Sequence, residues 1–376
     1  MSDRITPLQD LQQRQGARFV SFGGWSLPVS YAGILDEYWA VRRHAGLFDV
    51  SHMGRFLFEG ADAGRRLDAL LTQSVSDLAV GQGRYGLMCL PDGGILDDVI
   101  CFRLASERYL LVVNGAPREK DWSWIQSRLG EASGLSTQDT TLGSAMAALQ
   151  GPKSLEVLDR ALKAKGLEDV ASRVGALKRF QILQAKAAEP LPLLISRTGY
   201  TGEDGVEVYG PPQVLRELWS EFVEQGAQPA GLGARDVLRL EMGYLLYGQD
   251  ATEENHPYEA RLGWTVRGEK SVDFIGKEAL AGKKGISPKQ TLVGLRLAAG
   301  GIPRTGFEVR QAGQTAGRVT SGGYSPWLKA PIALAYYDGF EKSQWGIPVE
   351  VIVRGKAQQA TIIKPPFIDR SKPPKA

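Results

Sequence analysis

The amino-acid sequence predicts an α+β chain that ends in a small β-barrel or sandwich. Three observations support this prediction. Up to about residue 275, amphipathic helical stretches occur together with short apolar strands. Beyond that point, short strands and glycine-rich turns follow one another with almost no helical periodicity. The length of 376 residues also exceeds one ordinary core, which predicts two or three domains.

Composition and charge indicate a packed, soluble protein. Apolar residues make up 43% and charged residues 23% of the chain, and no run approaches the roughly 20 apolar residues that span a bilayer. The net charge of +3 is the difference between 45 basic and 42 acidic side chains, which are spread along the chain. This pattern disfavours a nucleic-acid partner. We therefore expect neither nucleic acid nor membrane among the partners.

Cysteine and histidine are sparse. The chain contains Cys89, Cys101, His44, His52 and His256. They are too scattered for a zinc cluster or a disulfide framework, so no metal site is expected. The N-terminal stretch has neither the apolar core of a secretory signal nor the acid-poor, Arg-rich character of a transit peptide. We therefore expect a cytoplasmic protein.

The first two thirds of the chain mix helices and strands. Residues 36–54 predict a helix that runs into a strand, because apolar side chains recur at near-helical intervals until Gly46 interrupts them. Residues 55–140 contain the apolar runs DDVICFRL and RYLLVVNG and the amphipathic stretch REKDWSWIQSRLG. These runs, separated by turn signals, predict an α+β lobe with antiparallel strands.

From residue 141 to about 250 the same mixture continues. SAMAALQGPKSLEVLDRAL predicts a strand, a turn and a helix, while PLLISRTGY and GVEVYG predict strands. PPQVLRELWSEFVEQG and GARDVLRLEMGYLL predict helices, the first with proline at a favourable start. The C-terminal strands include TLVGLRL and IALAYYD, and the polar tail DRSKPPKA predicts a frayed end.

Two adjacent aspartates, Asp97 and Asp98, precede an apolar run. Strand side chains alternate between faces, so Asp98 shares its face with Ile100 and further apolar residues, whereas Asp97 shares its face with Arg103 as a local counter-charge. A carboxylate on an apolar face is costly to bury unless a ligand or backbone N–H groups meet it. The common alternative for such a pair after glycines is a turn aspartate that caps the next segment.

The segment SRTGYTGEDGVEVYG places a glycine-rich loop between two strands, with Tyr200 in its middle. The glycines permit close turns of the backbone. On the following strand, Val206 and Val208 face one way while Glu207 and Tyr209 face the other. Glu207 therefore points either to solvent, the usual place for an acid, or into a pocket.

Other candidate motifs fail on their spacing. Gly231 and Gly233 precede a predicted helix, but Asp236 occupies the third glycine position of a dinucleotide fingerprint, and no apolar strand lies upstream. GPKS at 151–154 lacks the upstream glycine of a phosphate-binding loop. His256 is a single histidine among irregularly spaced acids, which predicts a surface loop with an aromatic anchor and not a metal site.

Seven motifs together carry a resemblance to a known family. They are FGGWSLPVSY, GLFDVSHMG, GGILDDVI, SRTGYTGEDGVEV, PAGLGARDVLRLE, YLLYGQD and TSGGYSP. Their order is that of the glycine cleavage T-proteins, which the chain resembles from near residue 5 to about residue 367. Each block alone is unspecific, but seven in register over nearly the whole chain are specific together.

The resemblance implies a three-domain cloverleaf around a central folate channel, with two α+β lobes and a C-terminal β-barrel. Its implied boundaries are 1–52 with 139–275 for a discontinuous folate-binding lobe, 53–138 for an inserted lobe, and 276–376 for the barrel. The implied reaction transfers the aminomethyl carbon from the lipoyl arm of the H-protein to tetrahydrofolate, with release of ammonia. Tetrahydrofolate is then the co-substrate, no metal is required, the lipoylated H-protein is the partner, and a monomer is expected.

The resemblance also implies roles for individual residues. Asp98 matches the aspartate beside the reactive folate nitrogens, where it would orient folate and manage charge while N5 attacks the aminomethyl carbon. Glu207 matches the pterin-binding acid. Further residues near the folate are Met53, Tyr85, Asn114, Tyr200, Arg235, Tyr244 and Trp264. Asp98→Asn is then expected to impair turnover, and Asp97→Asn to matter less.

Relatives of the same fold offer other groups to folate. They include methyl-transferring demethylases, folate domains of sarcosine-type dehydrogenases, and an iron–sulfur-associated tRNA-modification factor. The last carries a cysteine motif of the Lys-Gly-Cys-Tyr type, whereas this chain reads YLLYGQD there, which disfavours it. A folate-dependent O- or S-demethylase stays as the enzymatic alternative, because folate-binding residues do not specify the donor.

Overall fold

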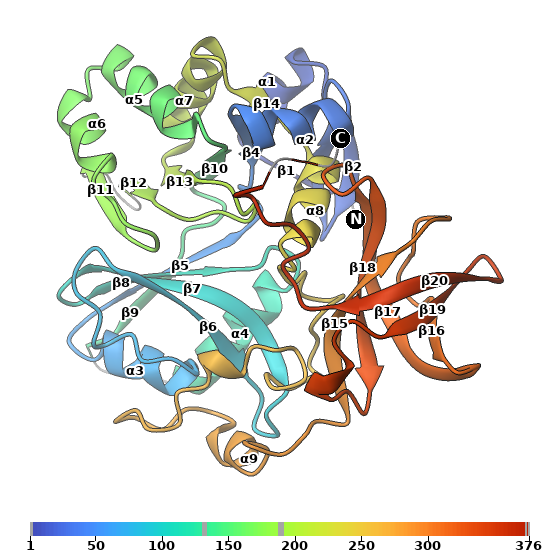
Figure 1. The fold of residues 1–376 in the computed structure, drawn as a ribbon. Coiled ribbons are helices and arrows are strands. Elements are labelled where there is room, and N and C mark those ends of the chain that lie inside the picture. The colour runs from blue at the N-terminus through green and yellow to red at the C-terminus, as the bar shows by residue number, and fades with distance from the viewer. Residues whose placement is uncertain (1–2, 130–133, 187–191, 373, 375–376) are drawn as a thin grey trace. The chain divides into compact units, whose positions relative to one another are not determined.

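The computed structural model describes residues 3–129, 134–186, 192–372 and 374 (Figure 1). The chain divides into two compact units. The first comprises Met1–Met88, Asp97–Arg235 and Lys270–Phe274, and the second comprises Cys89–Leu96, Asp236–Glu269 and Ile275–Ala376. Within the described ranges, no helix has the length and apolar character needed to cross a membrane.

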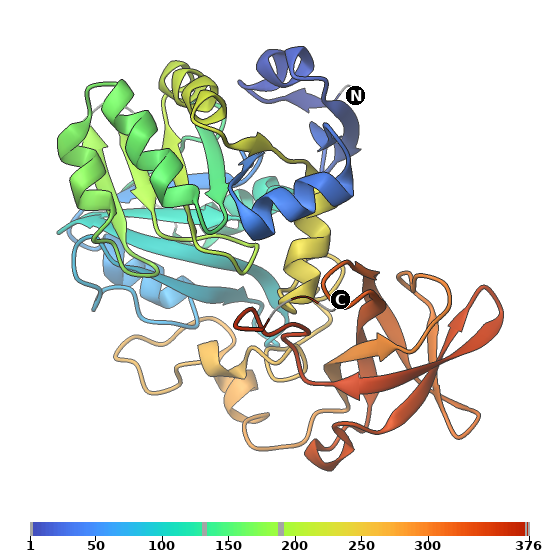
Figure 2. The same cartoon turned by 45° about the horizontal axis from the view of Figure 1, so that its top comes forward.

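A six-stranded sheet forms one half of the first unit, in the order β11-β12-β13-β10-β4-β14. Its strands are β4 (Gly46–Asp49), β10 (Ala145–Gln150), β11 (Ile182–Lys186), β12 (Leu193–Ser196), β13 (Gly205–Gly210) and β14 (Gln228–Pro229). Helices α5 (Ser154–Ala164), α6 (Glu168–Val174) and α7 (Pro212–Glu224) cover one face (Figure 2). Val206 and Val208 point into the core under these helices, so Glu207 and Tyr209 point to the opposite face.

A five-stranded sheet in the order β6-β7-β8-β5-β9 forms the other half of the first unit. Its strands are β5 (Gly54–Glu59), β6 (Gly83–Cys89), β7 (Ile95–Ala105), β8 (Arg108–Val113) and β9 (Ser136–Asp139). The pairs β7–β8, β8–β5 and β5–β9 are antiparallel, as the sequence predicted. Helix α3 (Ala63–Leu70) packs against β8 and against α4 (Arg118–Leu129).

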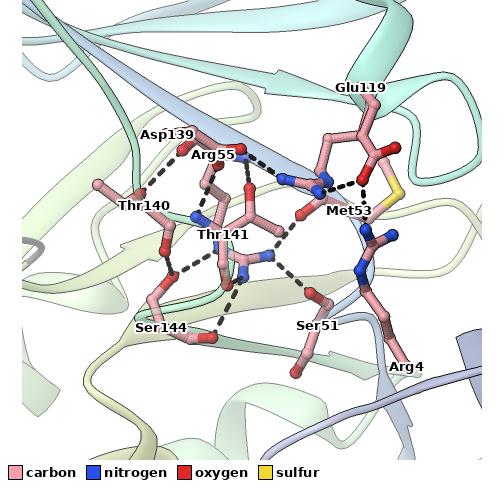
Figure 3. A network of polar contacts seen from close by, with 10 residues as sticks. Arg4, Ser51, Met53, Arg55, Glu119, Asp139, Thr140, Thr141 and Ser144 are labelled. Carbon is pink, nitrogen blue, oxygen red and sulfur yellow. Dashed lines mark hydrogen bonds and ion pairs between the residues drawn. The ribbon is translucent and has the colours of Figure 1, made fainter. Parts of the chain in front are cut away.

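A fully buried arginine, Arg55, joins the two chain connections between these sheets (Figure 3). Its guanidinium donates to the carbonyl of Ser51 at 3.1 Å and that of Met53 at 2.5 Å, both on the connection from β4 to β5. It also donates to the carbonyl of Thr141 at 2.6 Å and the hydroxyl of Ser144 at 2.8 Å, on the connection from β9 to β10. These bonds satisfy the buried charge and fix both connections to each other.

The N-terminal segment adds a small sheet that the sequence reading did not predict. Its order is β1-β3-β2, with β1 at Arg4–Ile5, β2 at Arg18–Phe22 and β3 at Trp25–Ser30. Helix α1 spans Gln9–Arg14, and α2 spans Ile34–Arg43. The predicted helix and strand over 36–54 are confirmed by α2 and β4. A two-residue strand such as β1 is too short to show alternation, which explains why it was missed.

The second unit contains a closed six-stranded barrel in the order β15-β18-β17-β16-β19-β20. Its strands are β15 (Gln290–Leu297), β16 (Glu308–Gln311), β17 (Gln314–Ser325), β18 (Ala330–Asp338), β19 (Pro348–Val353) and β20 (Lys356–Ile363). Alternate residues such as Val293, Leu295 and Val351 fill its interior. The predicted fold class, α+β with a C-terminal barrel, is confirmed.

Short elements complete the chain. Helix α8 spans Leu232–Glu241, α9 spans Lys277–Ala281, and 3₁₀ turns lie at Gly263–Thr265 and Lys342–Gln344. The helix predicted over GARDVLRLEMGYLL ends earlier than its periodicity indicated. Gly243, with φ of +67°, turns the chain just beyond Glu241 in a conformation that favours glycine. The boundaries of the three implied domains stay a prediction.

Candidate functional site

The candidate site lies where the two sheets of the first unit meet. The ring of Phe102 on β7 packs edge-on against Tyr209 on β13, with 6.5 Å between the centroids. Because side chains alternate along a strand, Asp98 lies on the Phe102 face of β7, and Glu207 lies on the Tyr209 face of β13. Both acids therefore face the junction of the sheets.

Asp98 lies within β7, so the turn-cap alternative for this residue is wrong. Its carboxylate accepts a hydrogen bond from the Tyr85 hydroxyl at 3.1 Å and one from Asn114 Nδ2 at 2.9 Å. Burial, and then the charge of Asp97, raise the pKa of Asp98 to about 7, although these two donors oppose the rise. Asp98 therefore changes its protonation state near neutral pH.

Asp97 does not use Arg103 as its counter-charge, so this part of the sequence reading is wrong. Arg103 instead donates to main-chain carbonyls, among them Leu78 at 2.8 Å. Asp97 is fully buried and accepts hydrogen bonds from the backbone N–H and Nδ2 of Asn114, at 3.0 and 2.8 Å. Asn114 thus bridges both aspartates, and the reason for expecting Asp97→Asn to matter less is lost.

Glu207 is buried, with 7% of its surface exposed, so it does not point to solvent. Its Oε2 accepts hydrogen bonds from the Thr198 hydroxyl at 2.6 Å and the Tyr209 hydroxyl at 3.3 Å. The pKa of Glu207 is raised, because the effect of burial exceeds the opposing effects of these donors and of the charge of Arg235. The sequence reading missed Thr198 and Tyr209 as partners. The shared face of Glu207 and Tyr209 on β13 was a usable signal for Tyr209, whereas Thr198 lies in the loop after β12.

Arg235 stacks on Tyr200, with its guanidinium carbon 4.8 Å from the ring centroid. Its Nη1 is buried and finds no hydrogen-bond partner among the residues that the structure describes. Burial lowers the pKa of Arg235, and Glu207 and Tyr200 counteract this. Tyr200 also raises the pKa of Tyr85, which links the Arg235–Tyr200 stack to the Asp98 cluster.

His52 is a buried residue that the sequence reading did not assign to the site. Burial, followed by the charges of Arg235 and Arg55, lowers its pKa to about 3, so the ring is neutral at physiological pH. In the described part of the chain, its Nδ1 also lacks a hydrogen-bond partner. Two orphaned polar atoms, on His52 and Arg235, leave hydrogen-bonding capacity that a polar ligand would satisfy.

The loop that carries Tyr200 is held from β10 by Gln150. Gln150 Nε2 donates to the carbonyl of Thr198 at 3.1 Å, and its Oε1 accepts from the Thr201 hydroxyl at 2.9 Å. A Cβ at Gly199 would lie 1.9 Å from this same Oε1. Glycine is required there because the backbone approaches a buried, fully engaged side chain.

The structure therefore brings together six of the residues assigned from the sequence, which are Asp98, Tyr85, Asn114, Tyr200, Glu207 and Arg235. Met53 contributes its carbonyl to Arg55, and no contact with the other described residues places its side chain in this cluster. Tyr244 and Trp264 belong to the second unit. The roles of all nine residues stay predictions.

No metal-binding group of three or more His, Cys, Asp or Glu side chains occurs in the ranges covered by the structure. The cluster instead offers carboxyl acceptors, a guanidinium donor and aromatic faces. Such a set recognises a flat heterocycle with N–H donors on its edge. Asp98 adds a group that can hold or release a proton near pH 7.

Comparison with known proteins identifies the family of the chain. The family model of the GCVT N-terminal domain matches residues 8–270, and that of the glycine cleavage T-protein C-terminal barrel domain matches residues 290–369. A curated aminomethyltransferase of Symbiobacterium thermophilum is 42% identical and covers 96% of each chain. That of Bacillus subtilis is 41% identical over 97% of this chain and 99% of its own length.

A solved structure extends the similarity to the fold. The crystal structure of glycine cleavage system aminomethyltransferase T from Bartonella henselae has a TM-score of 0.88 and 32% identity to this chain. The alignment covers 98% of this chain and 99% of that one. The chain therefore belongs to the glycine cleavage T-protein family of aminomethyltransferases.

Proposed function

We propose that this aminomethyltransferase uses tetrahydrofolate as the acceptor and the lipoylated H-protein as the donor. The observation that carries the proposal is the arrangement of Asp98 and Glu207 on facing sheets, beside the Arg235–Tyr200 stack. The curated relatives are named aminomethyltransferases, and the structural neighbour belongs to a glycine cleavage system. These names favour the aminomethyl donor over the methylated donor of a demethylase.

The chemistry of the cluster fits a reduced pterin. The pterin edge carries N–H groups that a carboxylate such as Glu207 accepts, and a carbonyl oxygen that a donor such as Arg235 meets. Tyr200 and Tyr85 offer aromatic surface for the ring faces. The Nη1 of Arg235 supports this fit. It is buried and has no hydrogen-bond partner among the described residues, and a bound acceptor would remove the cost of leaving it unsatisfied.

Asp98 would act at the reactive nitrogens. N5 of tetrahydrofolate attacks the aminomethyl carbon, the carbon–sulfur bond to the lipoyl arm breaks, and loss of ammonia with ring closure onto N10 gives methylenetetrahydrofolate and the reduced arm. An ionised Asp98 would orient the folate and balance positive charge at the attacked nitrogen, without a covalent bond to the protein. Tyr85 stays a donor to this carboxylate, because burial and Asp98 raise the pKa of its hydroxyl well above the usual value.

Product analysis tests the proposal. Incubation of the full chain with aminomethylated H-protein and tetrahydrofolate should give methylenetetrahydrofolate and ammonia in equal amounts. Asp98→Asn should lower this turnover by about 10²-fold or more, as expected for a group that stabilises developing charge. Methyltetrahydrofolate from an O- or S-methylated compound, with no ammonia from the H-protein, would instead support the demethylase. Cytoplasmic location and a monomeric state belong to the same proposal.

A further inference from the structure

Two further carboxyl groups, those of Asp97 and Asp121, are buried near Asp98. Asp121, on α4, is fully buried, as is Asp97 on the adjacent β7. No N–H or O–H group of another described residue donates to either Asp121 oxygen. The carboxyl of Asp97 lies within hydrogen-bonding reach of Asp121. Two carboxylates cannot form a hydrogen bond unless one of them carries a proton.

The surroundings determine which carboxyl group holds the proton. Burial raises the pKa of Asp97, but its two hydrogen bonds from Asn114, at 3.0 and 2.8 Å, oppose this rise and favour its charged form. Asp121 has no such donor in the described ranges, and burial followed by the charge of Asp97 raises its pKa to about 10. Lys120 on α4 opposes this rise and Asp98 adds to it. The proton therefore resides on Asp121.

We propose that Asp121 and Asp97 form a carboxylic acid–carboxylate pair with a single negative charge, and that this pair positions Asp98 through Asn114. Asp121 donates to Asp97, Asp97 fixes the amide of Asn114, and Asn114 Nδ2 then donates to Asp98 Oδ1 at 2.9 Å. Asp121 is thus a positioning residue that touches neither substrate. The expected effect of Asp121 on turnover rests on the proposed function. The protonated state of Asp121 does not depend on it.

Infrared spectroscopy tests the proton without any substrate. At about pH 8.5, Asp98, with a pKa of about 7, is largely ionised, whereas Asp121 keeps its proton. The difference spectrum between the full-length protein and Asp121→Asn should show the loss of one protonated carboxyl band. Asp68→Asn is the control, because Asp68 accepts hydrogen bonds from two hydroxyls and two backbone N–H groups, and no such band should vanish.

Kinetics with the same variants test the positioning. The amide of Asp121→Asn still donates to Asp97, so kcat should stay within about twofold. Asp121→Leu keeps the volume without a donor, and kcat should fall roughly 10- to 100-fold while KM for tetrahydrofolate changes little. Asp97→Asn removes a negative charge that raises the pKa of Asp98. The acidic limb of the pH profile, where kcat/KM rises as Asp98 ionises, should therefore move to lower pH.

The charge of the pair has its own readout. If Asp121 is protonated, Asp121→Asn does not change the single negative charge of the pair. The pKa of Asp98, and with it the acidic limb of the kcat/KM profile, then stays where it is in the parent protein. A limb displaced to lower pH in Asp121→Asn, or a carboxyl band that persists in this variant, overturns the proposal even when Asp121→Leu fails to fold. Absence of methylenetetrahydrofolate from the parent protein overturns the proposed function alone, because the infrared result does not depend on it.

Discussion

At the scale of single residues, Asp98 links the geometry of β7 to the pH range of activity. Its pKa of about 7 is set first by burial and then by Asp97, and the ionised form is the one that would balance charge on folate. We therefore expect kcat/KM to rise with pH through about 7 and then to level. The profile should be measured with aminomethylated H-protein saturating and tetrahydrofolate limiting, so that it reports the enzyme–H-protein complex before folate binds.

Tyr85→Phe is the matched control for this profile. The Tyr85 hydroxyl donates to Asp98 and lowers its pKa, so removal of the hydroxyl should raise the pKa and move the acidic limb to higher pH. Asp98→Asn should remove the limb altogether. A limb that keeps its position in both variants would assign the titration to another group.

The sequence could place the site acids but could not identify all of their surroundings. Alternation along a strand correctly assigned the faces of Asp98 and Glu207, because the period of two is a property of the backbone. What packs on each face depends on elements far along the chain. The partner of Asp97 was therefore misassigned to Arg103 on the same strand, while Asp121 on α4 was not considered.

At the scale of elements, the loop between β12 and β13 depends on a buried ion pair. Arg42 on α2 donates to the carbonyl of Thr201 at 2.8 Å and pairs with Glu203 at 2.8 Å, with side-chain exposures of 0% for Arg42 and 9% for Glu203. Both contacts lie within three residues after Tyr200, so α2 holds the loop whose Tyr200 stacks on Arg235. Breaking a buried pair costs more than breaking an exposed one.

Two neighbouring residues of this loop provide a matched test. Glu203→Gln removes the charge that Arg42 pairs with, and should lower the free energy of unfolding by about 2 kcal/mol and weaken tetrahydrofolate binding. Asp204 pairs with Arg197 but is 52% exposed, so Asp204→Asn should cost less than about 1 kcal/mol and leave binding unchanged. Denaturant unfolding and folate titration measure both effects, and equal losses in the two variants would contradict the role of the buried pair.

Elements with strong periodicity were the predictable ones. Helices α4, α5 and α7 were identified from their apolar stripes, and the barrel from its short strands and turns. The two-residue strands β1 and β14 carry no such pattern, because their positions come from pairing with β3 and β4. Tertiary pairing, and not local preference, forms these strands.

At the scale of the whole molecule, each of the two compact units has an apolar core. Leu149, Val206 and Trp219 belong to the core of the first unit, and Val293 and Val351 belong to the barrel core of the second. Tyr244 and Trp264, which the resemblance assigns to folate, lie in the second unit, and their roles stay predictions. A ligand that binds the folded chain stabilises it against unfolding, and a variant that lacks one of the ligand's contacts loses part of that gain.

Ligand-linked unfolding tests this assignment. Tetrahydrofolate at 100 times its Kd should stabilise the folded chain by about 2.7 kcal/mol. The resemblance implies that Trp264, 68% exposed, contacts the folate. Trp264→Ala is then expected to reduce this gain at the same ligand concentration by about 1 kcal/mol. Tyr324→Ala, which removes a 44% exposed aromatic of the same unit outside the assigned set, should keep the full gain. If Trp264→Ala also keeps the full gain while Glu207→Gln loses part of it, the folate contacts belong to the first unit, and Trp264 has no part in them.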